Sequence, residues 1–304
     1  MDGYCNLLQK TGDASFGDKV ETIFFNAAQG ARHPSKSCIS YCKTDNSYEM
    51  TGTKNGEPVG TEKQTRFKYS PAHQDVAVCC VPNAGRISPY FVKSLWMKDK
   101  DGLVATLLSP CELKTKWKGK EINITEETNY PFENTINFIV KTSGESDFSL
   151  KIRKPEWVKD FTINCDYKIE GQYIVINKSW KSEETISIEL KAEVEIKQLA
   201  NGQKYYKYSA LVFALPFESD EIITKTFAID GFADYQYNTK NNEAYKFIDE
   251  CKPEVLLNAE KPSQTIWESV EIKTELLNLK TNKPETVKLF PIGATILRQV
   301  TFEH

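Results

Sequence analysis

Two adjacent cysteines, Cys79 and Cys80, occupy the stretch of the chain that is richest in side chains able to do chemistry. His73 and Asp75 precede them, and Arg86 lies one turn further on in a helix that we expect to begin just after the pair. The partial positive charge at a helix N-terminus lowers the pKa of a nearby thiol. The pattern therefore predicts a reactive thiolate or a pair of metal ligands.

The residue types alone leave three interpretations of the cysteine pair open. Zinc takes four ligands from Cys, His or carboxylate side chains, and the pair supplies two of them. A catalytic Cys-His pair with His73 or His33 is the second interpretation. In the third, the thiols are small buried hydrophobes and His73 is a hydrogen-bonded loop residue, because free cysteine is among the most buried residue types.

The composition is that of an ordinary globular protein, which narrows the function classes. The chain has 304 residues with 39 basic and 42 acidic side chains, and its net charge of −3 argues against a nucleic-acid binder. No run reaches the ~18 apolar residues of a membrane span, and the sequence after Met1 is not a signal peptide. We expect a soluble chain without an export signal, whose eight cysteines are too dilute for a disulfide framework.

The first 98 residues show helical spacing. Apolar residues that recur on one helix face predict a helix over residues 14–28. A second helix is expected to begin at Asn83, and Pro89 inside it predicts a kink or a late start. Between the two helices, residues 30–80 are polar and unpatterned, and a connection of that length is usually functional or disordered.

Beyond residue 98 the apolar spacing changes to period two. The alternation is clear at residues 136–140, 148–152 and 186–190, which predicts half-buried strands. Many short strands at about 8–12-residue spacing indicate a β-sandwich. We therefore predict a mainly β fold with two β-sandwich modules preceded by helices.

Several motifs in the same order along the chain resemble one enzyme family. They are Thr11-Gly12-Asp13 with Phe25-Asn26-Ala27, the segment from Cys79 to Arg86, Asp101-Gly102-Leu103, Glu127 to Pro131, Lys151 to Trp157, Tyr208 to Leu215, and Pro291 to Arg298. Together they resemble glycoside hydrolase family 127, the β-L-arabinofuranosidase-like family. The likeness covers most of the chain and is weakest over residues 218–285.

The resemblance implies a retaining, exo-acting glycosidase built on an (α/α)6 barrel followed by β-sandwich domains. Residues 1–98 would be the end of that barrel, with its last helical hairpin and the Cys-Cys loop. Residues 99–217 would form a β-sandwich to which a final strand in 286–304 returns, and residues 218–285 would form a small inserted β module.

In the family that the chain resembles, zinc is held by one Glu and three Cys, and one of these cysteines is the nucleophile. The resemblance places nucleophile and ligand on Cys79 and a second ligand on Cys80. A thioglycosyl intermediate that water then hydrolyses would replace the usual two-carboxylate chemistry. A pocket tyrosine falls on Tyr41. The list of expected substrate-binding residues is Tyr41, His73, Asp75 and Arg86.

The chain also departs from the family pattern. The Glu-x-Cys ligand pair and the acid/base Glu would fall before Met1, and Cys5 lies too close to Gly12 to be the missing thiol, so we interpret it as a helix residue. We expect the C-terminal part of a larger glycosidase that acts on an oligosaccharide or glycan. The missing barrel segment is its expected partner, and the chain alone should show little or no hydrolysis.

Two other hypotheses compete with a glycosidase fragment. The chain could be a non-catalytic carbohydrate-binding or scaffolding β-sandwich protein, because exposed faces of its five tryptophans could stack on sugars. Burial of Trp117, Trp157 and Trp180 in the sandwich cores would remove that argument. The third hypothesis is a structural or redox metal site without catalysis.

Overall fold

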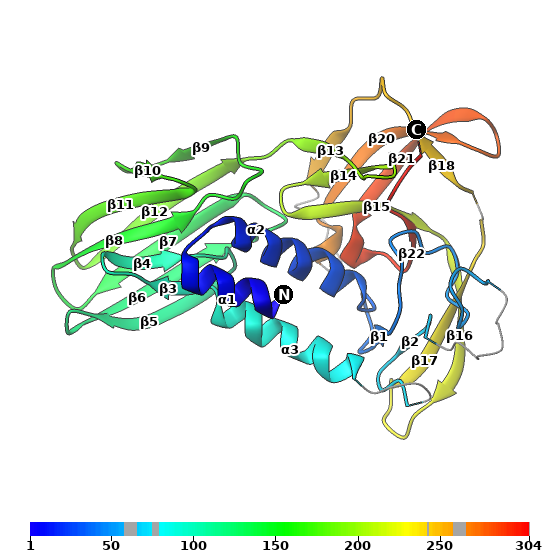
Figure 1. Cartoon of the computed structure of the whole chain (residues 1–304), viewed down its shortest axis with the longest axis horizontal. Coiled ribbons are helices and arrows are strands. Elements are labelled where there is room, and N and C mark those ends of the chain that lie inside the picture. Colours follow the sequence, from blue (N-terminus) through cyan, green and yellow to red (C-terminus); the bar gives the residue numbers. More distant parts are fainter. Residues whose placement is uncertain (58–65, 75–78, 242, 258–265, 304) are drawn as a thin grey trace. The chain divides into compact units, whose positions relative to one another are not determined.

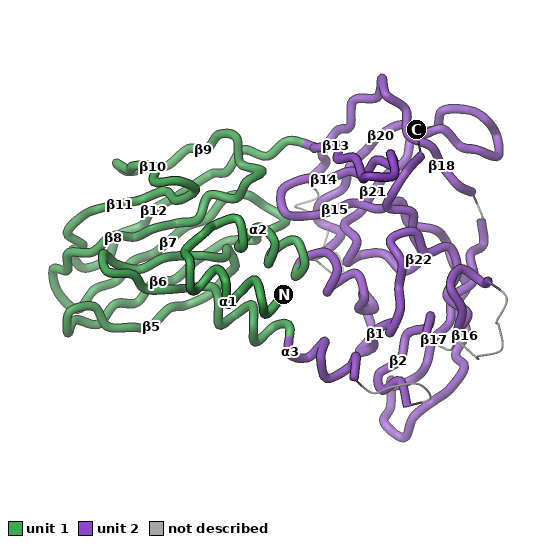
Figure 2. The backbone as a smooth tube through the Cα atoms, in the orientation of Figure 1, with its two compact units in different colours: residues 1–24, 87–193 green, residues 25–86, 194–304 purple. Residues whose placement is uncertain are grey.

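The computed structural model describes residues 1–57, 66–74, 79–241, 243–257 and 266–303. The chain divides into two compact units, each built from two separate stretches (Figure 2). The first unit combines residues 1–24 with 87–193, and the second combines residues 25–86 with 194–304. The two units are defined by which residues pack together in the fold. The boundaries predicted at residues 98, 217 and 285 were instead placed where the sequence pattern changes. None of the described helices is long and apolar enough to cross a membrane.

The first unit contains a sandwich of two five-stranded sheets (Figure 1). In spatial order, one sheet is β10 (Lys168–Glu170), β11 (Tyr173–Trp180), β8 (Ser146–Arg153), β4 (Gly102–Ala105) and β3 (Trp96–Lys98). The other is β5 (Cys111–Trp117), β6 (Lys120–Thr128), β7 (Thr135–Thr142), β12 (Glu183–Lys191) and β9 (Asp160–Ile163). All neighbours are antiparallel except β4 and β8, which run parallel.

Period-two alternation builds the sandwich, as the sequence predicts. Ile136, Phe138 and Val140 on β7 are at most 1% exposed, while the side chains between them are less buried. The two sheets meet through aromatic contacts, in which Trp96 of β3 packs edge-to-face on Phe138 with ring centroids 6.1 Å apart. The predicted strands at residues 136–140, 148–152 and 186–190 are confirmed.

Helices lie at the start of the chain. α1 (Asp2–Thr11) ends at Gly12, whose φ of 67° lets its N–H bond back to the Leu8 carbonyl. α2 (Ser15–Thr22) continues into the π-helical turn η1 (Ile23–Ala28), so the predicted helix over 14–28 is confirmed. Cys5 is a buried helix residue, as expected.

The second predicted helix, α3 (Cys80–Lys93), starts earlier than Asn83. The Asn83 N–H donates to the Cys79 carbonyl at 3.2 Å, which makes Asn83 an interior residue and not the N-cap. Pro82 lies in the first turn, where a missing N–H leaves no helical bond unmade, so the helix can form around it. The late start predicted from Pro89 is also wrong, because the helix runs through Pro89 to Lys93.

The second unit contains an eight-stranded and a four-stranded sheet. The larger sheet has β13 (Val194–Gln198), β14 (Lys204–Tyr208), β15 (Leu211–Phe217), β21 (Lys283–Pro291), β20 (Val270–Asn278) and β18 (Tyr245–Phe247) in that order, with β19 (Glu254–Leu257) on β20 and β22 (Leu297–Gln299) on β15. The smaller sheet has β1 (Ile39–Ser40), β2 (Tyr69–Ser70), β17 (Ala233–Thr239) and β16 (Ser219–Thr226). Two short 3-10 turns, η2 (Ile266–Glu268) and η3 (Ile292–Ala294), complete the described elements.

The described parts of the stretch 30–80 are held by this smaller sheet. β2 pairs with β17, where Tyr69 lies opposite Tyr235, and both side chains are buried in a cluster with Met50. A segment without periodicity of its own is therefore fixed by strands that come more than 150 residues later. This arrangement positions Tyr41, which directly follows β1.

Candidate active site at the cysteine pair

The two cysteines lie at the start of α3, within the second unit. Cys79 precedes the helix and is exposed, whereas Cys80 is its first residue and is partly buried. Asp75, which the sequence places in the same loop, lies outside the described residues. The exposed thiol is thus the one that the family resemblance designates as nucleophile.

Tyr41 lies beside this thiol, and its expected substrate-binding role stays a prediction. It directly follows β1, and its Oη is 3.8 Å from Cys79 Sγ, within hydrogen-bond distance for sulfur. The Arg66 guanidinium lies over the Tyr41 ring, 5.2 Å from its centroid. The Tyr41 phenol is therefore held near the Cys79 thiol by the end of β1 and by the Arg66 guanidinium that lies over its ring.

His73 packs against the ring of Tyr41. Its side chain is fully buried, its Nε2–H donates to the Ile39 carbonyl at 2.8 Å, and its ring meets the Tyr41 ring edge-on at 5.8 Å. Its φ of 49° lies in the left-handed region, and its N–H is bonded to Ser70 Oγ at 2.9 Å. His73 ties the strand before Tyr41 to the loop that leads to the cysteines, and its substrate-binding role stays a prediction.

Burial is the main cause of the pKa shift at Cys80. It raises the pKa of the Cys80 thiol, and a hydrogen bond with Cys79 adds to the shift. The hydrogen bond with Cys79 also raises the pKa of Tyr41. The lowered thiol pKa expected from a helix N-terminus is therefore not found at Cys80, so this thiol stays protonated near neutral pH unless a cation compensates.

Cys42 is a neighbour that the sequence reasoning missed. It follows Tyr41, its N–H donates to the Arg66 carbonyl at 3.1 Å, and its negative form would interact with Cys80. Burial raises its pKa, while Arg66 opposes the shift. In the sequence, only its position next to Tyr41 could have placed Cys42 near the site. Nothing else distinguished this cysteine within the polar stretch 30–80.

The described part of the chain does not bring together a full set of zinc ligands. There, no three His, Cys, Asp or Glu side chains are grouped closely enough to hold a metal ion. Cys79 and Cys80 have the soft sulfur donors that zinc prefers, but they account for half of a four-ligand set. The chemistry of the pair fits zinc, and the remaining ligands would have to come from outside the described residues.

The other residues singled out by the sequence lie elsewhere. Arg86 is exposed on α3. His33 is buried, and its Nε2 is 2.7 Å from Tyr237 Oη, which in turn donates to Glu221 at 2.5 Å. Burial lowers the pKa of His33 to about 4, with nearby Lys36 adding to the shift, so the ring is neutral at physiological pH.

The tryptophans of the sandwich do not form a stacking surface. Trp157 and Trp180 are 7% and 1% exposed, and Trp180 stacks on Phe148 within the core. Trp117 is partly buried, and its indole N–H donates to the Asp147 carbonyl at 3.0 Å. Burial of two of the three rings removes the argument that these aromatics bind sugar.

Comparison with known proteins agrees with the family resemblance. Residues 102–192 match the family model described as "Beta-L-arabinofuranosidase, GH127 middle domain". No curated protein matches the chain. The matched range covers most of the first-unit sandwich. The resemblance is therefore confirmed by a region that does not include Cys79 and Cys80.

Solved structures share the fold of almost the whole chain. Ara127N, a GH127 β-L-arabinofuranosidase from Geobacillus stearothermophilus T6, is 18% identical with a TM-score of 0.68, and the match covers 98% of this chain and 47% of that one. BT3674, a GH127 β-arabinofuranosidase, is 16% identical with a TM-score of 0.72, covering 99% and 47%. A third, described as a glycoside hydrolase, is 19% identical with a TM-score of 0.63, covering 98% and 49%. This chain spans about half the length of each of these proteins, and at this identity the likeness shows the fold alone.

Proposed function

We propose that this chain carries the cysteine loop and the β-rich half of a retaining, exo-acting glycoside hydrolase of the β-L-arabinofuranosidase type, with Cys79 as the nucleophile. The observation that carries the proposal is the contact between Tyr41 Oη and Cys79 Sγ, 3.8 Å apart at the start of α3. An exposed thiol held against a phenol is accessible to a sugar and already oriented. The substrate class is inferred from the family model that residues 102–192 match, and the shared fold is consistent with it.

In this proposal, Cys79 Sγ attacks the anomeric carbon, and the carbon–sulfur bond forms as the glycosidic carbon–oxygen bond breaks. A general acid protonates the departing oxygen, and water later displaces the sulfur with the same group acting as base. Tyr41 orients the attacking sulfur, and His73 holds Tyr41 in place. The two displacements together retain the anomeric configuration.

Zinc is the cofactor that we infer for this site. Cys79 and Cys80 would hold it, and bound zinc would supply the positive charge that keeps thiols deprotonated near neutral pH. The raised pKa of Cys80 gives a physical reason for such a cation, because burial alone favours the neutral thiol. No carboxylate joins the pair in a metal-binding group within the described ranges.

The isolated chain should therefore hydrolyse little or no substrate. The missing ligands and the general acid would come from further protein, such as the barrel segment that the resemblance implies. Purified chain 1–304 should show no turnover of an aryl β-L-arabinofuranoside above the rate of a Cys79→Ser variant. Turnover that the Cys79→Ser change abolishes would overturn the predicted inactivity and uphold the nucleophile, whereas turnover that survives the change would overturn the nucleophile.

Metal binding is tested separately by competition with a chromogenic zinc chelator. We expect zinc affinity to fall at least tenfold in Cys79→Ser and Cys80→Ser variants and to stay unchanged in Cys165→Ser, a partly buried cysteine of the first unit. Equal affinity in all four proteins would contradict the assignment of the ligands.

A further inference from the structure

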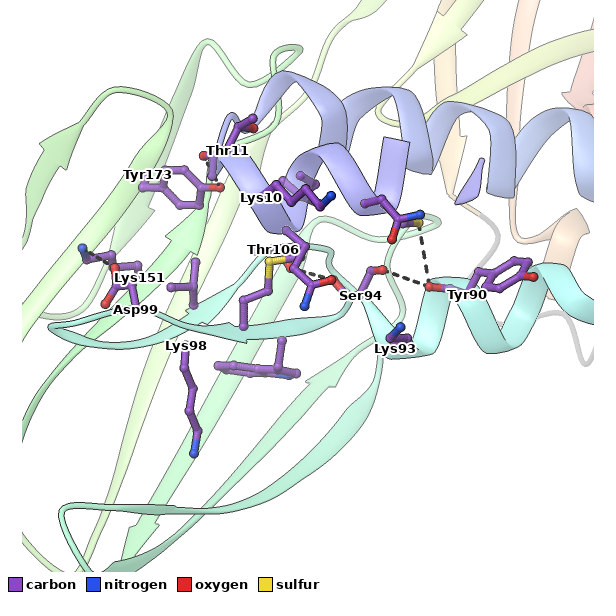
Figure 3. A pocket seen from close by; sticks show the side chains of 18 of the residues that line it. Lys10, Thr11, Tyr90, Lys93, Ser94, Lys98, Asp99, Thr106, Lys151 and Tyr173 are labelled. Carbon is purple, nitrogen blue, oxygen red and sulfur yellow. Dashed lines mark hydrogen bonds and ion pairs between the residues drawn. The ribbon is translucent and has the colours of Figure 1, made fainter. Parts of the chain in front are cut away.

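A cavity in the first unit shares no lining residue with the cysteine loop and has no role in the proposed hydrolysis. It has a volume of about 720 Å³ and is lined by α1, the end of α3, β3 and β4, with contributions from β8, β10 and β11. Figure 3 shows it with Tyr173 near one end, Tyr90 near the other and Lys10 between them. This volume lies within the range of small-molecule sites, about 300–1,000 Å³.

The buried base of the cavity, its floor, is apolar, and the hydroxyls beside it are hydrogen-bonded. Leu8 and Val104 are 0% and 8% exposed and give it an apolar base. Around them, Ser94 Oγ donates to the Tyr90 carbonyl at 3.0 Å, and Thr106 Oγ1 donates to the Ser94 carbonyl at 2.6 Å. These hydroxyls already donate to the carbonyls at the end of α3. An apolar ligand face can therefore contact the floor without breaking a hydrogen bond.

The rim, in contrast, carries polar groups that are not engaged. Six lining side chains have no hydrogen-bond or ion-pair partner within the described part of the chain: Asp2, Asn6, Gln9, Lys10, Lys93 and Glu170. Of these, Asn6 and Gln9 follow one another at helical spacing on α1 and present two free amides to the same side. Amides offer both donors and acceptors, which suits adjacent hydroxyl groups.

The charges around the cavity nearly cancel. Among the lining side chains, Lys10 and Lys93 are balanced in number by Asp2 and Glu170, and Lys151 is paired with Asp99 at 2.7 Å. Lys98 is the remaining cation, and its Nζ is bonded to the Lys116 carbonyl at 3.0 Å. A site for phosphate, sulfate or a metal ion would show an excess of one sign, which this rim lacks.

We propose that this cavity binds a neutral oligosaccharide of two to three sugar units. The apolar floor matches the C–H face of a sugar ring, and the free amides, carboxylates and ammonium groups match its hydroxyls. Binding involves no bond-making and no metal, so the cavity is an accessory glycan site. It stands whether or not Cys79 is a nucleophile.

The test is calorimetric titration of chain 1–304 with arabinotriose, cellotriose and trigalacturonate. We expect at least one neutral trisaccharide to bind and trigalacturonate to bind at least tenfold more weakly. The ligand should also shift the side-chain amide resonances of Asn6 and Gln9. No binding by either neutral trisaccharide at 10 mM (on the order of the weakest useful affinities), or tighter salt-sensitive binding of trigalacturonate, would overturn the proposal.

Variants on the exposed helix faces locate the site. Gln9→Ala and Lys93→Ala should each weaken binding about tenfold, because each removes a rim group, and alanine keeps the helix stable. Leu7→Ala and Val92→Ala are matched controls, since both side chains are exposed at 42% and 61% on the same helices but do not line the cavity. Binding that is equal in all four variants would place the sugar elsewhere and refute the assignment.

Discussion

Arg153 and Glu21 form an ion pair in which the side chains are 0% and 2% exposed. Asp18 is also bound by Arg153, at 2.6 Å, and the Tyr130 hydroxyl donates to Glu21 at 2.7 Å. Gly17 makes this approach possible, because a Cβ there would lie 2.6 Å from Arg153 Nε. The network joins α2 to β8 within the first unit, and its burial makes it costly to break.

Replacing Arg153 by Met should therefore destabilise the protein strongly. The change leaves the buried Glu21 and the partly buried Asp18 without their cation, which costs about 3–5 kcal/mol of unfolding free energy. Urea denaturation measures the loss. As a control, Lys141→Met breaks a pair with Glu183 in which both side chains are more than half exposed, and it should cost less than about 1 kcal/mol. Similar losses for the two variants would contradict the buried network.

Glu126 should make stability fall as pH rises. Burial raises its pKa from 4.5 to about 8, although the Ser109 N–H and the Cys111 thiol both donate to its carboxylate. Between pH 4.5 and 8 the folded protein keeps a proton that the unfolded chain has released, so the unfolding free energy drops by up to about 1.4 kcal/mol per pH unit.

The neutral variant Glu126→Gln should lose this dependence. It matches wild type near pH 4.5, and its advantage grows towards pH 8, then levels off. Urea unfolding of both proteins at several pH values across this window provides the measurement. Parallel stability curves over the whole window would show that Glu126 is ionised in the folded state.

The rate at which each cysteine is labelled should fall as its thiol becomes more buried. Cys79 is exposed and should react with iodoacetamide first, while Cys5 and Cys38 are 5% and 7% exposed and should react only on unfolding. Burial also raises the pKa of Cys38 to about 12, which leaves almost no thiolate near neutral pH. Peptide mass mapping after timed labelling gives the order, and early modification of Cys38 would refute this packing.

Gly102 should not tolerate even alanine. A Cβ at this position would lie 1.9 Å from the Ser149 carbonyl oxygen, across the parallel pairing of β4 with β8. The strands would have to move apart, and overpacking of this kind costs about 1–3 kcal/mol or more. At Gly144 a Cβ meets nothing within 4 Å, so Gly144→Ala is the control. Equal melting temperatures for the two variants would disprove the close approach.

Local pattern was sufficient to predict the strands β7, β8 and β12 of the sandwich and the helix over residues 14–28. Alternation such as Ile136-Phe138-Val140 reports burial directly, because one face of each strand packs inward. The start of α3 was missed because Asn83 is a good cap by residue type, whereas Pro82 fits a first turn equally well. The strands β1 and β2 could not be predicted, since β1 pairs only with β2, and β2 is held in the sheet by β17, which comes more than 150 residues later.

The candidate site was predictable in part. Cys79, Cys80 and Tyr41 were named from motif and resemblance, and the structure brings Tyr41 to Cys79. The raised pKa of Cys80 depends on burial that no local pattern reports. The cavity beside α1 was also out of reach, because its rim combines a helix with strands more than 80 residues away in sequence.

The separation between α2 and β8 has a consequence for synthesis on the ribosome. Asp18 and Arg153 are 135 residues apart in the chain. At about 5–20 residues per second, α2 emerges roughly 7–27 s before its arginine has been translated. During that interval Asp18 and Glu21 lack the cation that pairs with them in the folded protein, so this buried network can form only after β8 has been made.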